Sequence, residues 1–375
     1  MTIALTNSLD DFIAQQNRVL NFSAGPATLP EDVLRQAQQD LWSLFGTGIG
    51  ILEHSHRGKA FDRVLEEAEA DCRAIANISD DYAVIFVQGG ATLQFGLIPM
   101  NFLPDGRTAD YADTGVWTAK AIKDAKAVGD VHVAFEGSAT KYDHTPTDDE
   151  IKPSSNAAYF HYCSNNTIYG TDFHATPKHP APLIADMSSN IFSGPIDIES
   201  HAMIYAGAQK NLGPSGVALI IARKDFLATR CRKLPSLMCY DKIADKGSRL
   251  NTPPTFGIYM MGQVFKWILR EGGLKAMDTL NAAKSKVIYD AIDAAPSFYT
   301  APAHKRCRSR MNIAFRCPTP ELDAAFIAGA AEEGMDGLKG HRDTGGIRAS
   351  IYNAFPPAGC EALAQCMRAF AAEHG

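Results

Sequence analysis

The sequence places a candidate phosphate-binding turn after the apolar run 82–87. Gly89 and Gly90 follow that run and precede a predicted helix. Glycines let the backbone approach a ligand closely, and free N–H groups at a helix start, here those of Ala91 and Thr92, suit an anion. By itself the pattern fits a tight strand-to-helix turn equally well.

Two charged residues near other apolar runs could also act on a ligand. Asp186 lies in the run 183–187, where a carboxylate more often caps the next segment but can also hold a cationic ring. Lys210 lies between small residues, with apolar runs before and after it. A buried, unpaired ammonium is unfavourable, so such a lysine lowers its pKa or bonds covalently, as a Schiff-base lysine does.

Together these residues match the needs of pyridoxal phosphate. That cofactor requires a lysine for its aldehyde, a carboxylate for its pyridinium nitrogen and an anchor for its phosphate. Trp117, at the start of a predicted helix, could supply an aromatic face for the ring, and Thr167 a hydroxyl for the phenolic oxygen. Each of these two alone would fit a core tryptophan or a turn threonine. Because all these features occur in one predicted sheet, a pyridoxal phosphate site explains them better than several unrelated turns do.

The segments that must position these residues are typical of an α/β protein. Apolar residues at helical spacing predict helices at 30–45, 59–76, 91–102 and 116–128. Short apolar runs predict buried strands at 82–87, 130–135, 158–163, 183–187, 203–205 and 217–222. We expect these strands to form a large mixed or mostly parallel sheet, with ligands at the carboxyl ends of its strands.

A second, smaller α/β domain is predicted after a long helical stretch that starts at 257. Gly272 and Gly273 interrupt the stretch, which then continues to about 294. Strands at 311–315 and 347–352, a helix at 321–333 and a final helix follow. The predicted organisation is a large cofactor-binding domain at 21–270 and a small C-terminal domain at 271–375.

Composition excludes several classes of protein. The 375 residues are 46% hydrophobic and 21% charged, with a formal charge of −6, which argues against a dedicated nucleic-acid binder. The eight cysteines show no metal-ligand spacing, so reduced thiols and no metal site are expected. The first residues do not resemble a signal peptide, and no apolar run is long enough for a membrane span. We therefore expect a cytoplasmic protein without membrane partners.

Several blocks of the sequence resemble the phosphoserine aminotransferase family, within the class V pyridoxal phosphate-dependent aminotransferases. They include NFSAGPATLP, QGGATLQF, YAGAQKNLGPSG, NTPPTF and KGHRDTGGIRASIYNA, and the similarity covers residues 21 to about 355. The resemblance implies the type I fold of these transferases and a homodimer. It also implies reversible amino transfer between glutamate and 3-phosphohydroxypyruvate, which gives phosphoserine and 2-oxoglutarate in serine biosynthesis. Some relatives also act in vitamin B6 synthesis.

The resemblance assigns roles to individual residues. Lys210 would be the Schiff-base lysine, Asp186 the partner of the ring nitrogen and Trp117 the stacking ring, and these form the implied catalytic set. Thr167 would bond the phenolic oxygen. The implied phosphate contacts are Ala91, Thr92 and Gln209, with Asn251 and Thr252 reaching the phosphate from the neighbouring subunit. The implied substrate contacts are Arg348 for the α-carboxylate and His56, Arg57, His341 and Arg342 for the distal anion.

Two features depart from the family pattern, and three alternatives stay open. Residues 1–20 precede the typical start and predict an N-terminal arm, and some members carry arginine where Thr92 stands. The alternatives are a serine- or alanine-glyoxylate aminotransferase, a desulfurase that uses a cysteine such as Cys307, and a non-catalytic anion or RNA binder. Interleaved acids in the basic stretches 223–249 and 304–316 favour a solvated surface over RNA binding.

Overall fold

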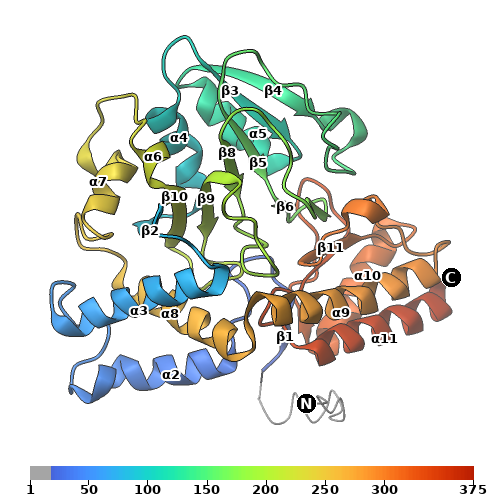
Figure 1. Ribbon diagram of the computed structural model, residues 1–375. Helices are drawn as coiled ribbons and strands as arrows, with labels where there is room; N and C mark the ends of the chain where they lie inside the picture. The colour runs from blue at the N-terminus through green and yellow to red at the C-terminus, as the bar shows by residue number, and fades with distance from the viewer. Residues whose placement is uncertain (1–17) are drawn as a thin grey trace.

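A computed structural model describes residues 18–375 of the chain (Figure 1). Residues 1–17, which make up most of the expected N-terminal arm, lie outside the described residues. No helix in the described part of the chain is long and apolar enough to cross a membrane.

A seven-stranded sheet forms the centre of the larger part of the molecule, in the order β2-β10-β9-β8-β5-β3-β4. β10 is antiparallel to β2 and β9, and the remaining neighbours are parallel. The expected mixed, mostly parallel sheet is therefore confirmed. Its strands are β2 (Tyr82–Gln88), β3 (Thr108–Asp113), β4 (Asp130–Glu136), β5 (Ala157–Cys163), β8 (Leu183–Asp186), β9 (His201–Gly207) and β10 (Val217–Arg223).

Helices cover both faces of this sheet. In β2, Val84 and Phe86 pack into one core while Ala83, Ile85 and Val87 pack into the other, as alternation along a strand requires. The helices of the first face are α2 (Glu31–Trp42), α3 (Lys59–Ala76) and α8 (Thr255–Arg270). The second face carries α4 (Ala91–Phe102), α5 (Val116–Lys126), α6 (Lys224–Leu227) and α7 (Tyr240–Asp245). Figure 1 shows these two sets on opposite sides of the sheet.

A separate hydrophobic core forms around the C-terminal part of the chain. Its helices are α9 (Gly273–Ala294), α10 (Pro320–Glu332) and α11 (Pro357–His374). Its strands are β11 (Asn312–Phe315), which pairs with β13 (Ile347–Ser350), and β1 (Leu20–Asn21), which pairs with β12 (Met335–Asp336). Leu20 and Phe22 are therefore buried in this second core, apart from the large sheet. The division into domains at 21–270 and 271–375 stays a prediction.

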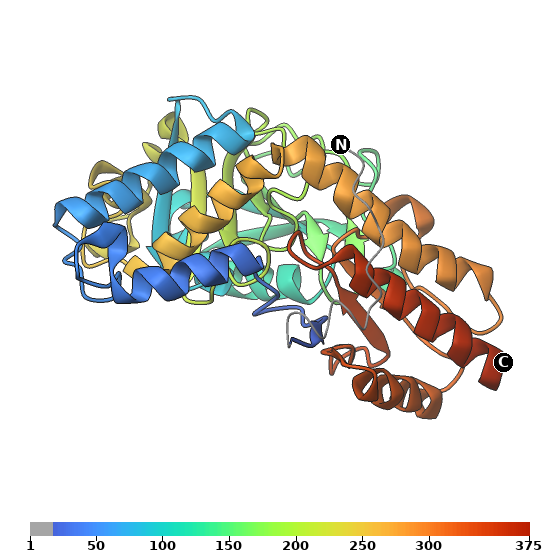
Figure 2. The ribbon, with the colours of Figure 1, turned by 90° about the horizontal axis from the view of Figure 1, so that it is seen from below.

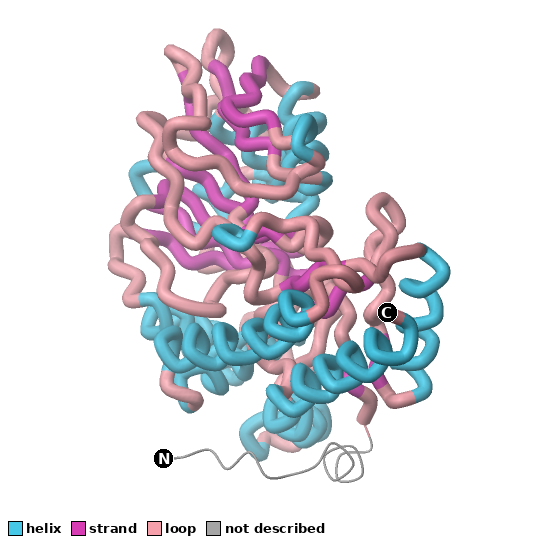
Figure 3. Tube along the Cα trace, turned by 90° about the vertical axis from the view of Figure 1, so that its right-hand side faces the viewer, coloured by secondary structure: helices cyan, strands magenta, loops and turns pink. Residues whose placement is uncertain are grey.

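Loops cover much of the molecule on the side from which Figure 3 is viewed, and the helices of the second core lie below them there. Two short strands, β6 (Asn165–Asn166) and β7 (Thr171–Asp172), form a hairpin beyond the end of β5. The hairpin places Thr167 between the large sheet and the second core, because Arg348 of β13 bonds to its carbonyl.

Strand β3 is the main element that sequence analysis did not expect. Its sequence, TADYAD, contains two aspartates, a residue type that is depleted in strands. Asp110 is nevertheless fully buried, since it accepts hydrogen bonds from Ser154 N (2.7 Å) and Ser154 Oγ (2.6 Å) and contacts His179 Nε2 (3.2 Å). Residues distant in sequence thus supply the hydrogen bonds that a buried carboxylate needs. The local composition around Asp110 is, by contrast, typical of a loop.

Lys284 of α9 holds the chain that follows β13. It is buried, and its ammonium donates to the carbonyl oxygens of Ile351, Tyr352, Asn353 and Phe355 at 2.7–3.3 Å. Within residues 18–375 these partners are all main-chain carbonyls, so peptide dipoles stabilise the charge.

We expect Lys284→Met to lower the free energy of unfolding by at least ~2 kcal/mol, because it leaves buried carbonyls without a donor. The matched control is Lys286→Met on the same helix, where the exposed pair with Asp290 should contribute less than ~1 kcal/mol. Urea unfolding of both variants measures the difference. Equal stability of the two variants would contradict the bonding role of Lys284.

Candidate active site

Asp186 and Lys210 come together because β8 and β9 are parallel neighbours. Asp186 ends β8 and pairs with Tyr205, while Lys210 lies in the turn that follows the end of β9. Burial lowers the pKa of the Lys210 amine, and the charge of Asp186 acts against that shift. The two groups therefore interact electrostatically at the carboxyl edge of the sheet.

Asp186 both caps the next turn and keeps one oxygen available. Its Oδ1 accepts hydrogen bonds from Ser188 N (2.9 Å) and Ser188 Oγ (2.5 Å). Ser188 Oγ in turn accepts from Gly207 N at 3.0 Å, which links the end of β8 to the end of β9. No hydrogen bond from a described residue reaches Oδ2, so this oxygen can accept a proton donor from a ligand.

Trp117, Thr167 and Arg348 form one continuous set of contacts beside Lys210. Trp117 Nε1 donates to Thr167 Oγ1 at 2.9 Å, and Arg348 Nη1 donates to Thr167 O at 3.1 Å. The Lys210 ammonium lies 5.2 Å from the centre of the Trp117 ring. Arg348 Nε is buried and has no hydrogen-bond partner among the described residues. The arginine therefore retains a donor for a further acceptor.

The start of α4 faces Gln209 across Gly207. A methyl group added to Gly207 would lie 2.7 Å from Gln209 Oε1 and 3.1 Å from the Ala91 nitrogen, so both groups border the same narrow space. Gln209 Oε1 is buried without a hydrogen-bond partner in the described chain. Gly89 adopts φ +88°, a conformation that favours glycine, and so allows the turn into α4. Thr92 is exposed at the rim of this turn.

A cavity of about 570 Å³ lies between the two cores and contains both Arg348 and His341 in its wall. Tyr142 and Tyr169 contribute aromatic surface to it. Burial lowers the pKa of His341, and the nearby charges of Arg348, Arg342 and Lys120 act in the same direction, opposed by Asp343. The side chain of Arg342 is 86% exposed and lies 3.6 Å from Asp343, outside the cavity lining.

Four predicted site residues lie elsewhere in this chain. His56 and Arg57 contact each other at 3.3 Å just before α3, and Figure 2 shows the start of α3 at the end of the molecule farthest from the second core. Asn251 lines a different, mostly apolar cavity of about 220 Å³, and Thr252 O accepts a hydrogen bond from Gln88 Nε2 at 3.0 Å. A single chain therefore does not assemble all the predicted anion contacts.

A family model for class-V aminotransferases matches residues 19–363. The chain belongs to the class-V aminotransferase family. A phosphoserine aminotransferase of Herpetosiphon aurantiacus is 47% identical over 358 residues, which cover 95% of this chain and 99% of that protein. The structure of phosphoserine aminotransferase from Bacillus circulans subsp. alkalophilus is 47% identical, with a TM-score of 0.94 over 96% of this chain and 100% of that one.

A pyridoxal phosphate-bound phosphoserine aminotransferase from Trichomonas vaginalis is 39% identical, with a TM-score of 0.89 over 94% of this chain and 100% of that one. The fold expected for a pyridoxal phosphate-dependent aminotransferase is thus confirmed by solved structures of the family.

Sequence analysis missed three residues that shape this aminotransferase site. Gly25 lies against Lys210, since a methyl group added there would approach Lys210 Cγ at 3.3 Å. Ser188 orients Asp186, and Lys120 places its ammonium 4.9 Å from the centre of the Trp117 ring. Gly25 lies in the block NFSAGPATLP, which resembles the family, so that block could have pointed to it. The three-residue spacing of Trp117 and Lys120 gives no such indication, because it occurs on any helix.

The electrostatic contact between Asp186 and Lys210 can be measured in cofactor-free protein. We expect amine-specific labelling of Lys210 to occur at lower pH than labelling of exposed lysines, because burial lowers its pKa. Asp186→Asn removes an attraction that favours the ammonium, so the midpoint should shift further down. Mass spectrometry of labelled peptides gives both midpoints, with exposed Lys286 as the internal control. A midpoint that stays unchanged or rises in the variant would argue against the contact.

Proposed function

We propose that this aminotransferase transfers an amino group reversibly between glutamate and 3-phosphohydroxypyruvate, which gives 2-oxoglutarate and O-phosphoserine. The observation that carries the proposal is the convergence of Lys210, Asp186 and Arg348 beside a cavity with further basic groups. The phosphoserine aminotransferases that match nearly the whole chain support the same substrate pair.

The residues present fit pyridoxal phosphate. Asp186 Oδ2 would accept the ring N–H, Trp117 would pack on the ring, and the Thr167 hydroxyl would face the phenolic oxygen. The side-chain NH₂ of Gln209 and the N–H of Ala91 would donate to the phosphate, with Thr92 at the rim. When bound, the cofactor supplies a ring that withdraws electrons from the α-carbon of the amino acid attached to it.

Lys210 would move the proton in the reaction. Its lowered pKa raises the fraction of neutral amine near neutral pH, and only the neutral amine can take a proton from the substrate α-carbon. The carboxylate of Asp186 opposes this shift of the Lys210 pKa. The Trp117 ring would exclude water from one face of the reacting centre.

Arg348 would bind the α-carboxylate of either substrate. Its Nη1 is anchored on Thr167 O, which leaves the unpaired Nε and the remaining nitrogen to face a carboxylate as a planar fork. His341, in the same cavity, would contact the distal group, a carboxylate in glutamate or a phosphate in phosphoserine. Arg342 directly follows His341 in the sequence and would also contact the distal group if its guanidinium left Asp343.

We further infer a homodimer, in which Asn251 and Thr252 would complete the phosphate site of a second copy. Exposed apolar side chains beside Asn251, namely Leu93, Leu237 and Met238, support burial of this surface. A contribution of His56 and Arg57 to the distal anion would likewise come from a second copy, since these residues do not line the cavity and lie just before α3, which starts at the end of the molecule farthest from the second core.

A glyoxylate-type aminotransferase is the alternative with the closest chemistry, because it shares the cofactor residues but binds no distal phosphate. A desulfurase would need an accessible cysteine at the cavity. Cys307 is buried, and its thiol contacts His304 O at 3.4 Å, outside the cavity lining. Use of the phosphorylated substrate of vitamin B6 synthesis and a cytoplasmic location stay predictions.

The decisive assay mixes purified protein with phosphoserine and 2-oxoglutarate and follows glutamate formation with and without added pyridoxal phosphate. We expect activity that depends on the cofactor, and Lys210→Ala should lower kcat by several orders of magnitude because the proton-moving amine is gone. The same variant should lose the visible absorbance of cofactor bound to the lysine. Rapid turnover of alanine and glyoxylate, with none of phosphoserine, would favour the alternative.

The lowered pKa of His341 predicts proton uptake when an anion binds. In the free protein the ring is neutral at pH 7, and a nearby phosphate raises its pKa, so binding is strongest at low pH and weakens as pH rises through the bound-state pKa. Calorimetry with 3-phosphoglycerate, which has both anionic groups but no amine, in buffers of different ionisation enthalpy measures the uptake. His341→Asn should take up fewer protons, and equal uptake would exclude this role.

A further inference from the structure

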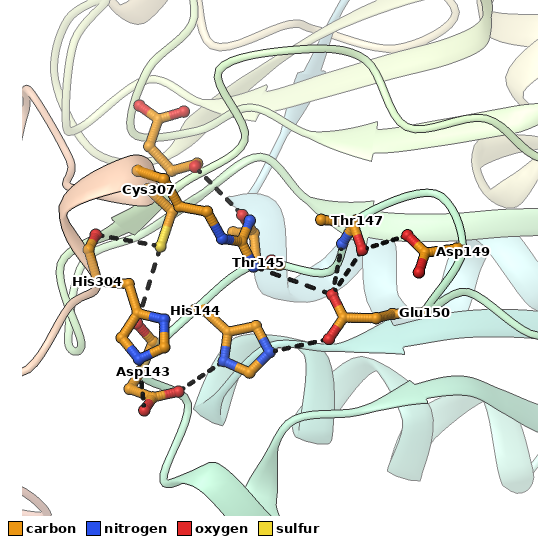
Figure 4. A network of polar contacts seen from close by, with 10 residues as sticks. Asp143, His144, Thr145, Thr147, Asp149, Glu150, His304 and Cys307 are labelled. Atoms are coloured by element: carbon orange, nitrogen blue, oxygen red, sulfur yellow. Dashed lines mark hydrogen bonds and ion pairs between the residues drawn. The ribbon is translucent and has the colours of Figure 1, made fainter.

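A cluster of potential metal ligands lies outside the candidate active site, where the two cores meet. Asp143 and His144 follow the short helix η2 (Ser138–Thr140), and His304 precedes η4 (Lys305–Cys307) in the C-terminal part of the chain. A hydrogen bond of 2.8 Å from His304 N to Asp143 O joins the two segments. Figure 4 shows the three side chains gathered around the Asp143 carboxylate.

The ligand-type atoms of this cluster all face one another. His144 Nδ1 lies 2.6 Å from Asp143 Oδ1, and His304 Nε2 lies 3.2 Å from Asp143 Oδ2. One such atom from each residue lies within 4.8 Å of the others. The two imidazole rings are stacked, with centres 5.3 Å apart and planes inclined by 11°. A tetrahedral zinc ion with bonds of about 2.0–2.1 Å needs its ligand atoms about 3.3 Å apart, a spacing within reach of small side-chain rotations.

The second nitrogen of His144 faces a carboxylate at ion-pair distance. His144 Nε2 lies 3.5 Å from Glu150 Oε1, and Glu150 is itself held by Thr147 N at 2.7 Å and Thr147 Oγ1 at 2.9 Å. Histidine ligands generally donate their other N–H to such a carboxylate, which fixes the tautomer and the ring orientation. Since His144 is also buried, its Nδ1 is held in one direction.

We propose that Asp143, His144 and His304 bind a divalent transition-metal ion of the zinc type. Two imidazoles and one carboxylate suit zinc, whereas magnesium and calcium prefer sites made of oxygen atoms. The side chain of His304 is 54% exposed, so water can reach the fourth position. Cys307 stays outside the donor set, because its thiol is buried and its Sγ contacts the main-chain carbonyls of Asp143 and His304.

The ion would bind next to the proposed substrate cavity and not inside it. Tyr142, which lines the cavity, directly precedes the ligand Asp143. Pro302, which also lines the cavity, lies two residues before the ligand His304. The ion would therefore connect the two walls of the cavity that come from different cores. This binding does not depend on the transferase activity, since none of its ligands belongs to the cofactor or substrate contacts described above.

The test uses full-length protein that has been treated with a chelator, dialysed, and then titrated with Zn²⁺ in a calorimeter, with Mg²⁺ as the comparison cation. We expect one Zn²⁺ per chain at this site and no matching Mg²⁺ isotherm. His304→Ala removes a ligand from an exposed position and should weaken Zn²⁺ binding at least about 100-fold. Glu150→Gln should weaken it about 10-fold, because the partner that orients His144 loses its charge.

His374→Ala is the matched control, since this histidine also lies beside a carboxylate, that of Glu373, but pairs with no second imidazole in residues 18–375. It should bind Zn²⁺ as tightly as the parent protein. Circular dichroism melting verifies that each variant is folded, and Zn²⁺ should raise the melting temperature of the parent and of His374→Ala but not of His304→Ala. Failure of the parent protein to bind Zn²⁺, or equal binding by His304→Ala, would overturn the proposal.

Discussion

The parallel pairing of β8 with β9 is the constraint on which the candidate active site depends. It places a carboxylate and an amine at the same edge of the sheet, where both are largely removed from water. Charges attract far more strongly in such surroundings than in bulk solvent, while burial disfavours each charge alone. Ser188 then occupies one oxygen of Asp186, so the other is left for a ligand, while the lysine is attracted by Asp186 and lies over the Trp117 ring.

Thr167 extends this site from the sheet to the second core. Its hydroxyl accepts a hydrogen bond from Trp117 of α5, and its carbonyl accepts one from Arg348 of β13. The cofactor residues proposed here therefore come mainly from the large sheet, while the proposed carboxylate-binding arginine comes from the second core. Any change in the relative position of the two cores alters the distance between these groups, and Lys284 restrains the segment that follows β13.

Similarity over nearly the whole chain establishes the class-V aminotransferase family. Several residues that sequence analysis assigned to anion binding do not line the cavity that contains Arg348 and His341. His56 and Arg57 lie just before α3, whose start lies at the far end of the molecule in Figure 2, and Asn251 lines a mostly apolar cavity with Leu93 and Leu97 of α4. The basic groups that line the cavity in one chain include Lys141 and Arg316 as well as Arg348 and His341, and such groups suit anions in general.

The sequence by itself determined the elements with strong local periodicity and the chemistry at the strand ends. The predicted helix at 59–76 has the bounds of α3, and the predicted strands at 82–87 and 217–222 lie within β2 and β10, because alternation and helical spacing are properties of adjacent residues. The residue types around Lys210 and Asp186 likewise indicated the cofactor. Tertiary structure decided the rest: it buried Asp110 in the unexpected strand β3, separated His56 from His341, and brought His144 to His304. Strand order and contacts between distant segments produce these arrangements, and no local pattern of residues contains that information.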